Sequence, residues 1–77
     1  MSTTRYGTKT EAAETIALHV RVFCRKHGRT PDLAIAEEIV SEYRGGHRGP
    51  WLQGVALIAN PKTVARRARQ DWDLVQA

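Results

Sequence analysis

The chain has 77 residues, of which 12 are Lys or Arg and 8 are Asp or Glu, so its formal net charge is +4. This length accommodates one domain, which buries only roughly 60% of the surface that the unfolded chain exposes. The single cysteine excludes an intrachain disulfide and a cysteine-based zinc site. No apolar run approaches the roughly 20 residues of a membrane span, and the first residues lack an apolar signal region. We therefore expect a small cytoplasmic binding protein with no membrane partner.

Apolar residues recur at helical spacing between three interruptions that are rich in glycine, proline or asparagine. The sequence predicts an all-α fold, a compact bundle of about four helices over residues 10–27, 31–44, 51–59 and 61–75. Residues 1–9 show no pattern and are expected to form a flexible N-terminal arm. Residues 10–77 then make up a single helical domain.

The first predicted helix carries two apolar strips. Thr8 and Glu11 have the spacing of a capping box, Thr10 is the alternative cap, and Gly28 is a natural C-terminal stop. The second strip, Leu18 and Val22, lies opposite the main one and requires a cover. A second subunit, or the N-terminal arm or the fourth helix, would each provide it. The main strip has 3.6-residue spacing and consists of Ala13, Ile16, Ala17, Val20, Phe23, Cys24 and His27.

The second predicted helix starts with Thr30 as its N-cap and Pro31 at its first position. The third is apolar nearly all round and is expected to lie buried between the others. Trp51 and Trp72 are interpreted as core anchors, with exposure of Trp51 at a binding surface as the alternative. The predicted inner face of the second helix consists of Leu33, Ala36, Ile39, Val40 and Tyr43.

The positive charge is concentrated in the C-terminal half. Residues 1–42 contain six cations and six acids, whereas the stretch from Tyr43 to Gln70 contains six cations and no acid. This basic zone coincides with the fourth predicted helix, which turns Val64, Ala65, Ala68, Trp72 and Val75 inward. A solvated helix face would give the same pattern, but the local excess of charge favours a polyanionic partner.

The segment of about residues 51–70 resembles the helix-turn-helix of bacterial and phage DNA-binding proteins, because a short apolar helix, an abrupt turn and a basic amphipathic helix follow one another. The second helix of such proteins often opens with a capping Ser or Asn, then two variable residues, Thr-Val and a basic residue two positions on. Asn60, Thr63, Val64 and Arg66 stand at these positions.

The same segment departs from the family pattern in three residues and in the length of its turn. Gln53 stands at a usually apolar position, Ile58 replaces the turn glycine, and Arg67 occupies a core position. The Asn60-Pro61 turn is also tighter than usual.

The resemblance implies a small regulator, such as a repressor, an excisionase-like factor or an accessory factor, that places its fourth helix in the major groove of double-stranded DNA. Such regulators commonly bind as homodimers, for which Leu18 and Val22 are the candidate interface. The alternative is a phage- or bacteria-encoded inhibitor or adaptor that binds a host protein. RNA is not distinguished from DNA. The candidate DNA-binding residues are Arg44, Arg48, Lys62, Thr63, Arg66, Arg67, Arg69 and Gln70.

The sequence gives little support for a metal site, a phosphate-binding loop or an enzyme active site. Cys24 and His27 lie one turn apart, but two further metal ligands are missing, so we expect no metal and no cofactor. The loop from Gly45 to Pro50 lacks the Gly-Lys-Ser/Thr ending of a phosphate-binding loop and follows a helix rather than a strand. No Ser or Cys nucleophile has an adjacent base, and no carboxylate pair faces inward. We therefore do not expect an enzyme.

Overall fold

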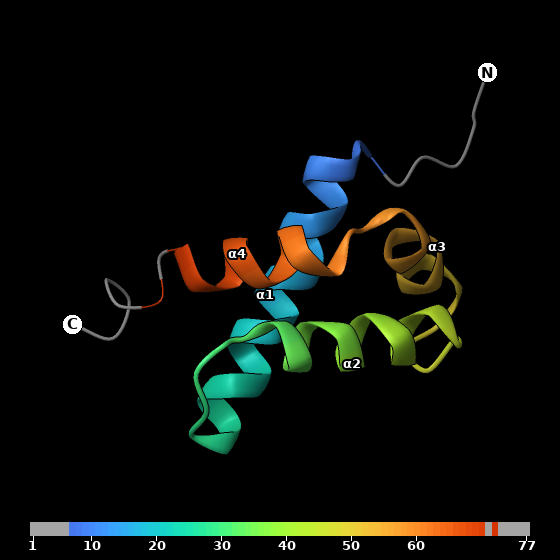
Figure 1. Cartoon of the computed structure of the whole chain (residues 1–77). Helices are drawn as coiled ribbons and strands as arrows, with labels where there is room; N and C mark the ends of the chain where they lie inside the picture. Colours follow the sequence, from blue (N-terminus) through green and yellow to red (C-terminus); the bar gives the residue numbers. More distant parts are fainter. Residues whose placement is uncertain (1–6, 71, 73–77) are drawn as a thin grey trace.

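The computed structural model describes residues 7–70 and residue 72, which form four helices (Figure 1). These are α1 (Lys9–His27), α2 (Leu33–Arg44), α3 (Pro50–Ile58) and α4 (Pro61–Gln70), which confirms the predicted all-α bundle. Val75 and the predicted end of the fourth helix lie outside the described residues, as do most of the predicted N-terminal arm and the last residues of the chain. None of the described helices is long and apolar enough to span a membrane.

The helices are arranged around α1. In Figure 1, α2 and α4 run side by side in opposite directions, and α1 crosses behind α4 and passes the start of α2. α3 lies at one end of this pair, between the end of α2 and the start of α4, and packs against α2 and α1. This arrangement buries one face of α4 against two helices and leaves its opposite face to solvent.

Residues at the two ends of α1 determine where the helix begins and ends. Glu11 N donates to Thr8 Oγ1 at 3.1 Å and Thr8 N donates to Glu11 Oε1 at 2.8 Å, which confirms the capping box. Gly28 ends the helix in the left-handed conformation with a φ of 65°, which disfavours side chains other than glycine.

The start of α2 differs from the prediction. Asp32, not Thr30, is the N-cap, because its Oδ1 accepts a hydrogen bond from Ile35 N at 2.8 Å. Pro31 precedes the helix and is fully buried. Leu33, predicted to face inward, is exposed, and Ile35 is buried in its place. The two positions are about 200° apart around the helix, so only Ile35 shares the inner face.

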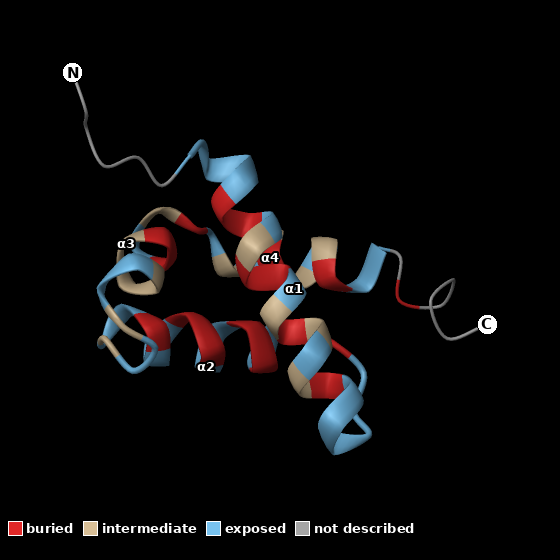
Figure 2. Ribbon diagram, turned by 180° about the vertical axis from the view of Figure 1, so that it is seen from behind, coloured by how far each residue is buried: buried red, intermediate tan, exposed pale blue. Residues whose placement is uncertain are grey.

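The core lies where α2 and α4 cross α1 (Figure 2). Three alanines of α1 are completely buried, so the other helices approach its backbone closely. Trp72 is buried as predicted, whereas Phe23 is only half-buried. The buried residues are Ala12, Ala13, Ile16, Ala17, Val20, Cys24, Ile35, Ala36, Ile39, Val40, Tyr43, Val55, Ala56, Ala59, Val64, Ala68 and Trp72.

The expectation that α3 is buried all round is wrong. Within α3 only Val55 and Ala56 are buried, while Trp51 is 53% exposed and Leu57 is 62% exposed. The reason is its position at the end of the bundle, where α1 and α2 contact one side of α3. Trp51 is therefore exposed and is not a core anchor.

An arginine of α2 holds the C-terminal end of α3. Arg44 donates from Nε to the carbonyl of Ala56 at 2.8 Å and from Nη2 to that of Ala59 at 2.9 Å. The last carbonyls of a helix have no partner within it and carry partial negative charge, so a guanidinium is well suited to this position. Gln53 of α3 donates in turn to the carbonyl of Arg44 at 2.9 Å, which ties the two helices together a second time.

An arginine of α1 contacts the last described turn of α4. Arg21 donates from Nη2 to the carbonyl of Arg67 at 2.8 Å and from Nε to that of Ala68 at 3.2 Å. Together with the contacts of Arg44, these hydrogen bonds tie α3 and α4 to the first two helices.

We predict that Arg44→Ala lowers the free energy of unfolding by about 1–2 kcal/mol, because two charge-assisted hydrogen bonds to helix-end carbonyls are lost. The matched control is Arg66→Ala, which removes an exposed arginine and should change the stability by less than about 0.5 kcal/mol. Urea denaturation followed by circular dichroism measures both values. Equal stabilities of the two variants would contradict this role of Arg44.

Candidate nucleic-acid interface

The start of α4 is set by the turn that the sequence analysis singled out. The Oδ1 atom of Asn60 accepts a hydrogen bond from Lys62 N at 2.9 Å, and its carbonyl accepts one from Val64 N at 2.9 Å. Pro61 occupies the first helical position, where no intrahelical N–H bond is required. The Asn60-Pro61 boundary is confirmed, and it sets which side of α4 faces the core.

The exposed side of α4 is basic. Lys62, Arg66, Arg69 and Gln70, which we call the α4 basic face, are all exposed. Their positions span about 100° of the helix circumference, opposite the buried Val64 and Ala68. Within the described part of the chain, none of these four side chains forms a hydrogen bond or an ion pair. Thr63 borders this face and is half-buried.

Arg67 has a different role from its neighbours on α4. Its side chain is half-buried, and Nη1 donates to Glu14 Oε2 of α1 at 2.7 Å. Its carbonyl accepts the hydrogen bond from Arg21 described above. Arg67 therefore connects α4 to α1, and its charge is balanced within the fold.

The two predicted arginines outside α4 lie elsewhere. The guanidinium of Arg44 is directed at the end of α3. That of Arg48 lies 5.9 Å from the centroid of the Tyr43 ring, next to α1. Of the eight predicted residues, the structure brings Lys62, Thr63, Arg66, Arg69 and Gln70 together along the exposed side of α4.

Sequence reasoning missed a contact between α1 and α2. The Tyr43 hydroxyl lies 3.1 Å from Nδ1 of His19, and the two rings meet edge to face with centroids 5.5 Å apart. Burial, together with the positive charge of Arg48, lowers the pKa of His19 below its ordinary value of 6.5. Burial raises the pKa of Tyr43. The two residues are 24 positions apart, so no local pattern indicates the pair.

Cys24 and His27 do not converge on a common site. Cys24 is buried, and burial raises the pKa of its thiol. His27, predicted on the buried face, is exposed and stacks on Phe23 with ring centroids 4.4 Å apart. Between residues 7 and 70, and at residue 72, no group of three or more His, Cys, Asp or Glu side chains is placed to hold a metal ion.

No protein-family model, no curated protein and no solved structure matches the chain.

We predict that His19 makes the fold less stable at acidic pH. The unfolded chain takes up a proton at His19 as the pH falls through about 6.5, whereas the folded chain resists protonation until lower pH, so stability is lost as the pH falls. His19→Gln keeps a polar partner for Tyr43 but does not titrate. Between about pH 7.5 and about pH 5, the original chain should lose more unfolding free energy than this variant. Equal losses in urea denaturation would refute the prediction.

Proposed function

We propose that this protein binds nucleic acid, with double-stranded DNA as the favoured ligand, through the α4 basic face. The observation that carries the proposal is the contrast among the basic residues. Three cations, Lys62, Arg66 and Arg69, lie on one exposed stripe and are not neutralised by any other described residue. A stripe of this kind attracts a polyanion and lies where a ligand can reach it.

Other arginines have partners within the fold. Arg21 and Arg44 donate to backbone carbonyls of α4 and α3, and Arg67 is paired with Glu14. The guanidinium of Arg25 lies 5.6 Å from the ring centroid of Trp72. These contacts leave the α4 basic face as a distinct source of positive potential rather than one part of a uniformly basic surface.

The dimensions of α4 suit the major groove. An α-helix with its side chains is roughly 10–12 Å across, and the major groove of B-DNA is about 12 Å wide. Arginine forks donate two parallel hydrogen bonds to a phosphate or to a guanine edge. We assign base contacts to Lys62, Thr63 and Arg66, following the helix-turn-helix resemblance, and phosphate contacts to Arg69.

A second candidate function is supported by exposed apolar side chains. Trp51 and Leu57 project from α3 with more than half of their surface in solvent. Exposed apolar groups of this size are frequent at protein–protein interfaces. They favour an inhibitor or adaptor that binds a host protein. Such a protein would not need the α4 basic face to bind duplex DNA.

We predict that the affinity for duplex DNA falls steeply with salt. If Lys62, Arg66 and Arg69 each neutralise one phosphate, log K falls with log[salt] with a slope of about −2.7 per chain, or roughly 40-fold for a fourfold rise in salt. Fluorescence anisotropy with a labelled duplex measures this slope. An affinity that hardly changes with salt would refute the electrostatic mechanism.

We further predict that Arg66→Ala and Arg69→Ala each weaken DNA binding and reduce the magnitude of the salt slope by about 1. Arg29→Ala is the matched control, because Arg29 is an exposed arginine in the connection between α1 and α2. This substitution changes the net charge by the same amount but lies outside the α4 basic face. The DNA affinity of the Arg29→Ala variant should therefore remain close to that of the original chain. Equal weakening by all three substitutions would contradict a defined interface on α4.

A further inference from the structure

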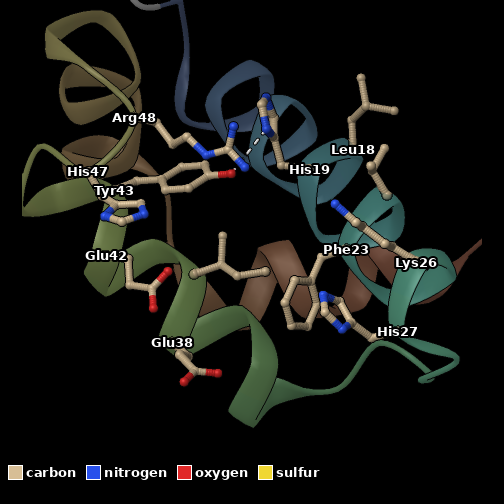
Figure 3. Close-up of a pocket in the computed structure, with 12 residues that line it drawn as sticks. Leu18, His19, Phe23, Lys26, His27, Glu38, Glu42, Tyr43, His47 and Arg48 are labelled. Atoms are coloured by element: carbon tan, nitrogen blue, oxygen red, sulfur yellow. Dashed lines mark hydrogen bonds between the residues drawn. The ribbon is translucent and has the colours of Figure 1, made fainter.

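A groove with a volume of about 570 Å³ lies between α1 and α2 (Figure 3). Phe23 of α1 and Ile39 and Tyr43 of α2 line it with apolar surface. Leu18 and Val22 extend this surface along the outer side of α1, where they are 55% and 56% exposed. Among the described residues, neither α4 nor any other segment covers these two side chains, so the apolar surface is open to solvent.

Most of the groove lies on a different side of α1 from the contacts with the C-terminal helix. Glu14, Arg21 and Arg25 share one side of α1 and contact Arg67, the carbonyls of α4 and Trp72. Phe23 and Lys26, which line the groove, lie roughly 100–180° around the helix from these positions, whereas Leu18 and Val22 lie between the two sides, roughly 20–100° away. The groove therefore opens beside α2, and Leu18 marks its edge nearest to α4.

The two rims of the groove carry opposite charges. Lys26 lies on the α1 rim, and Glu38 and Glu42 lie on the α2 rim (Figure 3). All three are exposed, and none forms an ion pair with another residue in the described part of the chain. His47 and Arg48 lie at the end of the groove next to the loop that follows α2.

We propose that this groove binds a second copy of the chain in a two-fold symmetric dimer. In such an interface the same patch faces itself, so the patch must be complementary to its own rotated copy. A two-fold axis that runs along the groove brings the α1 rim of each protomer over the α2 rim of the other. Lys26 then faces the partner's Glu38 and Glu42, and this contact occurs twice.

The apolar part of the surface fits the same arrangement. Leu18 and Val22 lie on the same strip of α1 as Lys26, so the rotation that pairs the rims lays them along the partner's α2 rim. The exposed apolar strip of α1 and the apolar lining of the groove are thereby both removed from solvent. A uniformly acidic or basic partner would match one rim and meet like charge on the other. A domain of this size also gains stability from the additional buried surface.

The proposal is independent of nucleic-acid binding, because it rests on α1 and α2. Its test is the oligomeric state of the full chain, measured by sedimentation equilibrium over a range of protein concentrations. We expect a reversible monomer–dimer equilibrium. Val22→Glu should weaken the dimer at least roughly tenfold, because it places an acid in the apolar seam.

Leu57→Glu is the matched control, because it introduces the same charge at a similarly exposed leucine of α3, outside the groove. It should leave the dimer constant unchanged. Since Val22 and Leu57 are both more than half exposed, the circular dichroism spectra of both variants should match that of the original chain. A dimer weakened equally by both substitutions, or only by Leu57→Glu, would overturn the proposal.

Charge reversal tests the pairing of the rims. Lys26→Glu alone, and Glu38→Lys with Glu42→Lys, each give two rims of like charge and should weaken the dimer. The triple variant restores opposite rims and should restore most of the affinity. A chain that stays monomeric at every concentration would overturn the proposal and would assign the groove to a different partner. A triple variant whose dimer affinity is no higher than that of the single-rim variants would also overturn it.

Discussion

The placement of the two C-terminal helices depends on arginine side chains that reach across the bundle to backbone carbonyl groups. Arg44 reaches from α2 to the end of α3, and Arg21 reaches from α1 to the last described turn of α4. The last carbonyls of a helix have no partner within it, so Arg44 satisfies groups that would otherwise need water and meets the negative end of the α3 dipole. These contacts accompany the burial of Val64 and Ala68, which leaves the basic side of α4 facing solvent.

The attachment of α4 to α1 separates two surfaces, the α4 basic face and the groove between α1 and α2. α4 is attached to one side of α1, whereas most of the groove lies on a different side. A dimer formed through the groove would carry two copies of the α4 basic face. Two linked binding faces would raise the affinity for a ligand that spans both, without any new contact. Exposed Leu18 and Val22 would then serve the dimer, and exposed Arg66 and Arg69 would serve the ligand.

Local sequence signals were sufficient to predict most of the helix boundaries, but they did not predict the contacts between helices. Gly28 and Asn60 end or start helices through their own backbone and side-chain geometry, so the sequence shows them directly. Asp32 is the cap in place of the predicted Thr30 because both residue types can cap a helix, and Pro31 between them is buried ahead of the helix rather than within it. The exposure of Leu57 depends on where α3 lies in the bundle. Arg44 was predicted as a ligand contact because no local pattern shows that it reaches another helix.

The contacts of Arg21 and Arg44 with backbone carbonyls explain part of the high arginine content. Nine of the twelve basic residues are arginine, which taken alone suits phosphate recognition. Yet Arg21 and Arg44 each donate to two carbonyls at once, a geometry that the planar guanidinium fork provides and a lysine ammonium does not. Part of the arginine bias therefore follows from the fold itself. The proposed nucleic-acid ligand is supported by the grouping of Lys62, Arg66 and Arg69 on one exposed side of α4, and not by the net charge of +4.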